Sequence, residues 1–148
     1  MSFDEILEHA VTDALLMVND VEFAVAGMEK VKLASGDHLM WLWATDGSWL
    51  IVDHEADELI SLHPVENEVE EEDEYVSYGG VSYEEMQEDQ GEISSVEGEV
   101  DHEVGESFII KQYENSAAGL MRSLEWVGYG EERWFHGKML SEDDVRVA

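Results

Sequence analysis

The stretch that decides the fold is Leu39 to Val52, which reads LMWLWATDGSWLIV. Two apolar runs flank Asp46-Gly47, a dipeptide typical of two-residue β-hairpin turns because Asp and Gly tolerate a positive φ angle. Such a turn pairs Trp43 with Leu50, and side chains then alternate between the two faces of each strand. One face is expected to carry Trp41, Trp43, Leu50 and Val52, and the other Met40, Leu42, Ala44, Trp49 and Ile51.

Both faces of this hairpin are apolar, so we expect it to lie in the centre of the protein and to be covered on both sides. Each large apolar side chain that becomes fully buried contributes roughly 1.5–3 kcal/mol to stability. The hairpin would therefore dominate the core. An aromatic platform for a ligand or partner is the functional alternative, because tryptophan rings also serve as binding surfaces.

The net charge of the chain restricts its partners. Of 148 residues, 37 are Asp or Glu and 7 are Lys or Arg, which gives a formal net charge of −30. Such a surface repels nucleic-acid phosphate and anionic lipid, so we expect neither direct nucleic-acid binding nor an electrostatic membrane anchor. Three interpretations remain: a highly soluble bacterial cytosolic protein, a protein adapted to high salt, and a decoy whose carboxylates mimic phosphates for a basic nucleic-acid-binding protein.

Redox and targeting features favour the cytoplasm. The chain has no cysteine, which excludes disulfides, thiolate metal sites and cysteine nucleophiles and fits a reducing compartment. Its first residues, MSFDEILEHA, are acidic where a secretory signal would be basic. No apolar run reaches the roughly 18 residues that a bilayer span requires, so we expect no membrane insertion.

Hydrophobic spacing and charge predict a mainly β (α+β) protein of two small antiparallel lobes, either twisted sheets or partly open barrels. Residues 1–64 form the N-terminal lobe, which begins with an amphipathic helix over residues 2–18 whose Ser2 and Glu5 match a capping box. Residues 65–74, VENEVEEEDE, form a solvated acidic linker. Residues 75–140 form the C-terminal β lobe, and residues 141–148 form an acidic tail that we expect to fray.

A series of short motifs runs through the C-terminal half: Gly80 and Tyr83, Val96 to Glu99, Val104-Gly105, Tyr113-Glu114, Ser123 to Trp126, and Glu132 to Gly137. Together with the Trp-rich hairpin, this series resembles bacterial proteins of domain-of-unknown-function family 4178 over about residues 21–140. The resemblance implies a mostly β fold and an accessory role, with no assigned activity and no catalytic residues to carry over. Family members tend to be encoded beside membrane-stress and small membrane-protein genes, which implies a link to those systems.

The candidate interaction residues are carboxylates. The acidic linker presents a run of them to a partner, at Glu66, Glu68, Glu70, Glu71, Glu72, Asp73 and Glu74. Two further glutamates, Glu99 and Glu125, lie in strand motifs, where a charged residue indicates a structural or functional role. The structural alternative for both is an ion pair with one of the few cations, which would contribute only about 0–1 kcal/mol near the surface. The candidate cations are Arg122, Arg133 and Lys111.

The six histidines do not predict a metal site, because none stands in an H-x-x-x-H or H-E-x-x-H spacing. They are His9, His38, His54, His63, His102 and His136. In Asp53-His54-Glu55 and Asp101-His102-Glu103, neighbouring side chains would point to opposite faces of a strand. The chain also lacks a nucleotide-binding glycine loop and a nucleophile motif. We expect no metal, no cofactor and no catalytic residue.

These observations predict a non-enzymatic, acidic accessory protein that binds a protein partner, one with a basic surface. The alternative function is a nucleic-acid mimic of the phage anti-defence type that inhibits a basic DNA- or RNA-binding enzyme. An enzyme is the third hypothesis. Acid that is spread evenly over the surface argues against mimicry, and turnover of a small substrate would argue for an enzyme.

Overall fold

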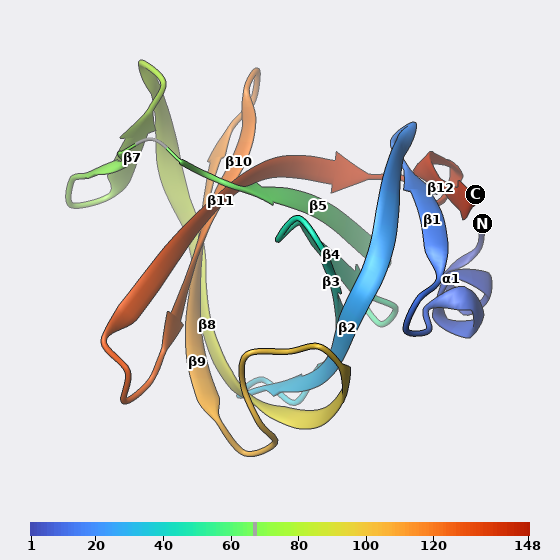
Figure 1. Cartoon of the computed structure of the whole chain (residues 1–148). Helices are drawn as coiled ribbons and strands as arrows, with labels where there is room; N and C mark the ends of the chain where they lie inside the picture. The colour runs from blue at the N-terminus through green and yellow to red at the C-terminus, as the bar shows by residue number, and fades with distance from the viewer. Residues whose placement is uncertain (67) are drawn as a thin grey trace.

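The Trp-rich hairpin forms two neighbouring strands of a closed antiparallel barrel, β3 (His38–Ala44) and β4 (Trp49–Asp53) (Figure 1). The computed structural model describes residues 1–66 and 68–148, and within them eight strands close the barrel. Their order is β2 (Val21–Leu33), β3, β4, β5 (Glu58–Pro64), β11 (Glu131–Leu140), β10 (Gly119–Trp126), β9 (Ser107–Asn115) and β8 (Val81–Gly98), and β8 pairs with β2. Closure leaves these strands without a free edge.

The mainly β class is confirmed, but the prediction of two lobes is wrong. The two halves of the chain share one barrel, because β5 pairs with β11 on one side and β2 pairs with β8 on the other. Alternating hydrophobicity indicates which face of a strand is buried, and it does not indicate which distant strand will be its neighbour. The boundary expected at residues 65–74 therefore lies between strands that belong to the same sheet.

The hairpin turn is one residue longer than predicted. The amide of Gly47 donates to the Ala44 carbonyl at 3.0 Å, and the amide of Ala44 donates to the Ser48 carbonyl at 2.9 Å. Gly47 has φ 89° and Asp46 does not have a positive φ, as in a type I turn followed by a left-handed glycine. A shift of one residue moves every side chain of a strand to the other face. Trp43 consequently lies opposite Trp49, and Trp41 opposite Ile51.

This register gathers all three hairpin tryptophans inside the barrel. Trp41 and Trp49 are fully buried there among the rings of Phe108, Trp126 and Phe135. The outer face of the hairpin is covered as well, because its buried side chains pack on the N-terminal helix. These are Leu42, Leu50 and Val52, which contact the cluster of Phe3 and Ile6. The prediction that both faces are covered is confirmed, while the predicted division of residues between the faces is wrong.

The N-terminal helix is shorter than predicted. α1 (Phe3–His9) has the predicted capping box, in which the Glu5 amide donates to Ser2 Oγ at 3.2 Å, but the helix ends at His9 rather than at residue 18. β1 (Leu15–Val18) follows and turns into β2 through Asn19-Asp20, which have φ 51° and 64°. The β-branched pair before Asp13 disfavours continued helix, and pairing with β2 supplies the hydrogen bonds that a helix would have made.

The C-terminal residues are held in place, in contrast to the expected frayed tail. They form η1 (Glu142–Asp144) and β12 (Val145–Val147), and β12 pairs with β1. The N-terminal ammonium donates to the carbonyls of Glu142 and Val145 at 2.9 and 3.0 Å. Val145 is fully buried. Figure 1 shows the two termini side by side at this edge of the molecule.

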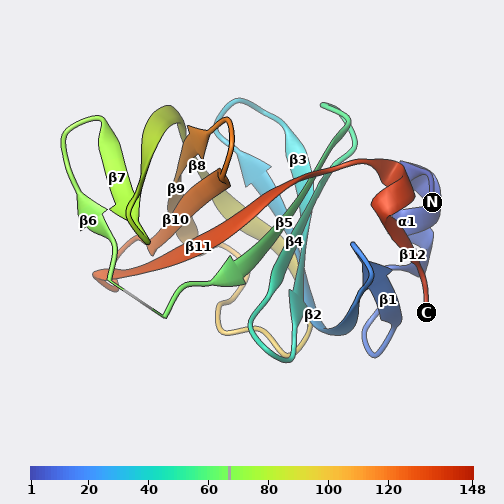
Figure 2. The same cartoon turned by 90° about the horizontal axis from the view of Figure 1, so that it is seen from above.

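The acidic segment lies at the opposite edge (Figure 2). β6 (Glu70–Glu71) and β7 (Tyr75–Tyr78) add a small hairpin to the first half of β8, where Val76 and Tyr83 form a separate cluster with Tyr113 and Met121. The expected linker therefore contains an edge strand. Residue 67 of that segment lies outside the described residues.

At Gly137, strand β11 lies so close to its paired neighbour β5 that there is no room for a side chain. A methyl group there would collide with the backbone carbonyl of Ser61. We expect Gly137→Ala to lower the free energy of unfolding by about 1–3 kcal/mol, the usual cost of overpacking. Urea unfolding followed by circular dichroism measures this. Lys138→Ala, on the next and exposed residue, is the control, and an equal loss in both variants would contradict the steric explanation.

Candidate functional site

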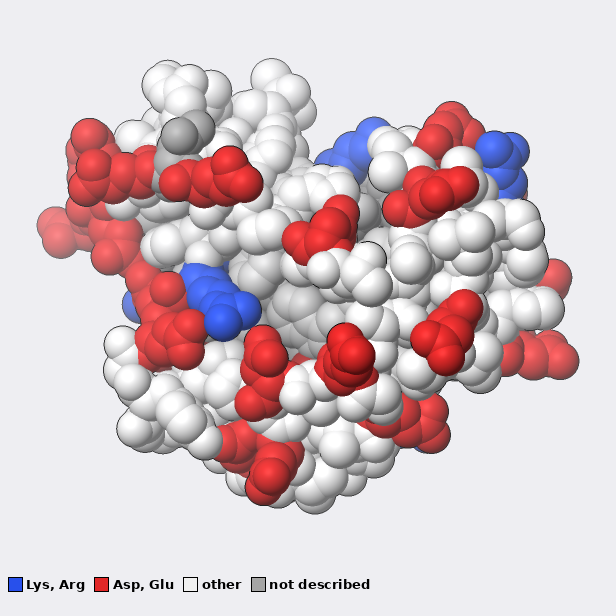
Figure 3. Space-filling view, in the orientation of Figure 1, with Lys and Arg blue, Asp and Glu red and all other residues white. Residues whose placement is uncertain are grey.

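One end of the barrel opens into a pocket of about 940 Å³. The β3–β4 turn, the start of β11 and the loop 99–106 between β8 and β9 surround it, and Figure 1 looks toward this end. Figure 3, in the same orientation, shows a hollow near the centre of the face with acidic side chains around it. We call this pocket the barrel mouth.

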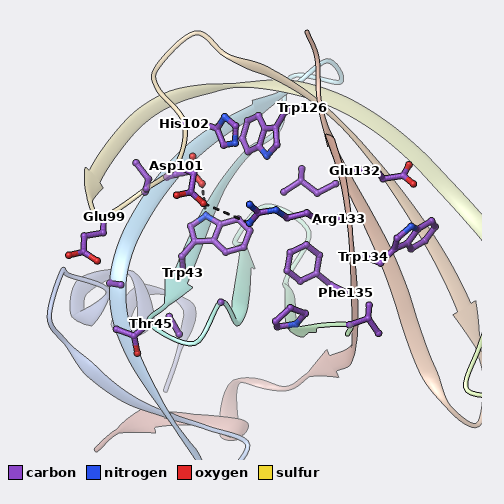
Figure 4. Close-up of a pocket in the computed structure, with 18 of the residues that line it drawn as sticks. Trp43, Thr45, Glu99, Asp101, His102, Trp126, Glu132, Arg133, Trp134 and Phe135 are labelled. Atoms are coloured by element: carbon purple, nitrogen blue, oxygen red, sulfur yellow. Dashed lines mark hydrogen bonds and ion pairs between the residues drawn. The ribbon is translucent and has the colours of Figure 1, made fainter. Parts of the chain in front are cut away.

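Aromatic rings form much of the wall of the barrel mouth (Figure 4). Trp43 stacks on Trp49 with ring centroids 4.9 Å apart and planes inclined by 15°. His102 stacks on Trp126 at 3.8 Å and 18°. The ring centroid of Phe135 lies 5.9 Å from that of Trp43. Because the rings support one another in this way, the wall is preorganised.

The deepest polar group of the barrel mouth is the carboxyl group of Glu29, which is only 2% exposed. Trp43 Nε1 donates a hydrogen bond to Glu29 Oε1. The second oxygen, Oε2, is buried and has no hydrogen-bond partner among the described residues. Burial raises the pKa of Glu29 to about 7. The negative charges of Asp101 and Glu106 also raise this pKa, whereas the hydrogen bond from Trp43 lowers it. A buried acceptor without a partner costs roughly 1–3 kcal/mol.

Glu29 faces inward because of an irregularity in β2. The pairing of β2 with β3 shifts register between Val25 and Gly27, where the strand bends. Gly27 lies at this shift, and because it has no side chain the backbone of Glu99 can approach β2 closely there. Beyond the bend, Glu29 lies in phase with Val31 and Leu33, which are both in the barrel interior.

The rim of the barrel mouth carries charged side chains, mostly acidic. Glu99 and Asp101 lie around the opening with Arg133, whereas the carboxylate of Glu132 points away from it (Figure 4). The guanidinium of Arg133 bonds Glu131 Oε1 at 3.1 Å through Nε, and its Nη1 lies 3.8 Å from Asp101 Oδ2. Glu68 completes the acidic rim. The site thus pairs an aromatic wall with a titratable carboxyl group at its floor and negative charge at its rim.

The predicted interaction residues fall in different places. Of the acidic run, Glu66, Glu68, Glu70, Glu71, Glu72, Asp73 and Glu74 are all exposed, and only Glu68 lines the barrel mouth. Glu99 lies on the rim, while Glu125 lies opposite Glu132 in the β10–β11 pair, away from the mouth. Among the described residues neither Glu99 nor Glu125 forms an ion pair. Whether any of these side chains binds a partner stays a prediction.

Arg122 is a second buried charge that sequence reasoning did not place. It lies inside the barrel between Leu120 and Leu124, with Nη2 donating to Gln112 Oε1 and the guanidinium carbon 5.7 Å from the Trp49 ring centre. Burial lowers the pKa of Arg122 to about 10, and Glu58 and Asp89 oppose that shift. Arg122 therefore supplies a positive charge to the interior rather than a counter-ion to Glu99 or Glu125.

The histidines are dispersed over the fold. His54 Nε2 lies 2.9 Å from Asp4 Oδ1, His63 Nδ1 lies 2.8 Å from Ser48 Oγ, and His136 Nε2 lies 3.0 Å from the Ala118 carbonyl. Within residues 1–66 and 68–148, no three His, Asp or Glu side chains gather as metal ligands would. The expected absence of a metal stays a prediction. No helix in these residues has the length and apolar character that a bilayer crossing needs.

The chemistry of the barrel mouth suits an organic cation. A cation above an aromatic face contributes about 0.5–2 kcal/mol, with the larger values in sites that exclude water. A buried carboxylate oxygen without a partner gains a charge-assisted hydrogen bond when an N–H donor reaches it. The sequence contained one signal for this site, since Glu29 stands in the alternating pattern where an apolar residue is expected.

Comparison with known proteins supports the family assignment. The model of the family described as Domain of unknown function (DUF4178) matches residues 15–142, which is most of the chain. Neither the curated proteins nor the solved structures contain a significant match. The chain therefore belongs to the DUF4178 family.

Proposed function

We propose that this protein is a non-enzymatic binding protein that recognises a basic segment of a partner protein at the barrel mouth. The observation that carries the proposal is the combination, in one open pocket, of a preorganised aromatic wall, an acidic rim and the buried Oε2 of Glu29, for which the described residues provide no hydrogen-bond partner. Ligand sites of this kind are concave and aromatic, with a few placed polar groups. We place this function in the cytoplasm and propose an accessory role in bacterial membrane or stress systems.

The charge of the protein and the barrel mouth have separate tasks in this proposal. A net charge of −30 attracts a basic partner from a distance and accelerates its encounter, an effect that salt screens. Exposed ion pairs on the rim contribute only about 0–1 kcal/mol each. Specificity therefore depends on the wall and floor, where a basic side chain can lay its aliphatic stem on Trp43 and Trp126.

A matched pair of double variants tests the proposal. Glu99→Gln with Asp101→Asn removes two charges from the rim, and Glu8→Gln with Glu55→Gln removes two exposed charges elsewhere. We expect a fluorescent peptide of alternating Gly and Lys to bind the wild type, and the rim variant to weaken binding about tenfold at 50 mM salt, since each neutralised neighbour costs roughly 0.5–1 kcal/mol. Fluorescence anisotropy measures the affinity.

The control variant decides between the two hypotheses on the acidic surface. We expect Glu8→Gln with Glu55→Gln to change the affinity less than twofold, as two distant charges in salt would. Equal weakening in both variants would mean that binding is spread over the surface, as in a nucleic-acid mimic, and would overturn a role for the barrel mouth. A peptide that does not bind the wild type at all would overturn it too.

A further inference from the structure

We propose that the barrel mouth holds one primary ammonium group, the side-chain end of a lysine on the partner, which donates a hydrogen bond to Oε2 of Glu29, the oxygen that Trp43 does not bond. This inference rests on the proposed function and specifies the group that is recognised. It starts from the buried carboxyl group of Glu29 at the floor of the pocket. One oxygen of this group accepts a hydrogen bond from Trp43, and the other has no hydrogen-bond partner among the described residues.

The hydrogen-bond geometry at Glu29 favours a point donor. A guanidinium binds a carboxylate best through two parallel bonds to both oxygens, and Trp43 Nε1 already occupies Oε1. A quaternary ammonium has no N–H and would leave Oε2 without a partner. A divalent cation prefers several oxygen ligands, whereas in the part of the chain that the structure describes no three acidic or histidine side chains are arranged to hold a metal ion. A primary ammonium can give one proton to Oε2 and direct the others toward the rim.

The surroundings of Glu29 determine how binding depends on pH. Its own carboxyl has a pKa raised to about 7 by burial, so the free site is partly protonated at neutral pH. The charged and titratable groups that line the same pocket are Asp101 and His102 from the loop 99–106, Glu99 beside them, Arg133 from β11, and Glu68. Glu132 of β11 lines it with its carboxylate turned away (Figure 4), and Glu106 acts on Glu29 through its charge. Arg133 is already held by Asp101 and Glu131. An arriving ammonium favours the ionised carboxylate, so binding must release a proton from Glu29.

The expected pH effect follows from this proton release. A carboxyl with pKa 7 is ionised in about one molecule in eleven at pH 6 and in ten of eleven at pH 8. We therefore expect the affinity for the lysine peptide to rise about tenfold from pH 6 to pH 8. Lysine itself stays charged over this range, because its pKa is about 10.4.

The experiment compares four peptides that differ at one central position among glycines: lysine, arginine, trimethyl-lysine and norleucine. Titration calorimetry at pH 6, 7 and 8 gives the affinity, and repeating pH 7 in two buffers of different ionisation enthalpy gives the protons released. We expect lysine to bind at least tenfold tighter than each of the others, with release of about half a proton at pH 7. Arginine or trimethyl-lysine binding as tightly as lysine would overturn the inference.

Glu29→Gln is the decisive variant, because Gln keeps an oxygen for Trp43 and loses the titratable group. We expect it to weaken lysine binding at least tenfold at pH 8 and to abolish both the pH dependence and the proton release. Unchanged affinity and pH profile in Glu29→Gln, with binding still sensitive to Glu99→Gln and Asp101→Asn, would overturn the ammonium site and leave the proposed function intact. If Nα-acetyl-lysine amide, a single residue that keeps the side-chain ammonium group, binds as tightly as the peptide, the ammonium site is supported. A protein partner as the source of the ammonium group is then overturned.

Discussion

Replacing Trp49 with alanine is expected to lower the free energy of unfolding by about 3–5 kcal/mol, the usual range for removing a large buried aromatic ring. Trp49 is fully buried in the barrel interior. Its ring centre lies 4.7 Å from that of Trp41 and 5.1 Å from that of Phe135, and it stacks on Trp43. A loss of this size is comparable to a large part of the stability of an ordinary domain.

The size of the effect follows from the position of Trp49 between elements that are distant in sequence. Its ring contacts β3 and β11 and lies under the Arg122 guanidinium of β10, so the cavity left by alanine has walls on several strands that cannot collapse together. Urea unfolding followed by far-ultraviolet circular dichroism is the suitable measurement, because the mutation removes a fluorophore. Trp134→Ala is the control, since Trp134 is only partly buried. A loss in Trp49→Ala no larger than that in Trp134→Ala would contradict the central position of Trp49.

The second large expected effect is a change in the pH dependence of stability when Glu29 is replaced with glutamine. The pKa of Glu29 is raised from 4.5 to about 7 in the folded protein. The folded state therefore holds a proton that the unfolded state releases between these values. The stability from this group is fully present below pH 4.5 and is lost as pH rises through 7. A shift of this size corresponds to about 3 kcal/mol.

The comparison of two variants isolates this contribution from the repulsion among the other acids. We expect the unfolding free energy of Glu29→Gln, relative to wild type, to increase by about 3 kcal/mol between pH 4.5 and pH 8. Glu8→Gln removes an exposed carboxylate and is expected to follow the wild-type profile. Urea unfolding at four pH values in constant salt provides the measurement. Parallel profiles for wild type and Glu29→Gln would show that Glu29 titrates alike in both states.

The candidate site was only partly predictable from the sequence. Glu99 and Glu68 were among the predicted residues and do line the barrel mouth, whereas Glu125 and the rest of the acidic run lie away from it. Glu29 was missed among 37 acids, although its phase with Val31 and Leu33 places it on an inward face. In a chain this acidic, composition does not single out Glu29, although its burial in the pocket makes it chemically distinct.

Local features of the chain were determined by the sequence itself. The capping box of Ser2 and Glu5, the turn around Gly47 and the burial of both faces of the Trp-rich hairpin follow from residue types and their alternation, because φ preferences and side-chain periodicity act over a few neighbours.

Only the tertiary structure decided the pairing of β5 with β11 and of β2 with β8. Every strand offers the same backbone donors and acceptors, so hydrogen bonding does not specify which distant strand becomes its neighbour. Strand alternation alone is therefore equally compatible with two open lobes and with one closed barrel. Barrel closure is also what brings Glu29, Trp126 and Asp101, far apart in the chain, around a single pocket.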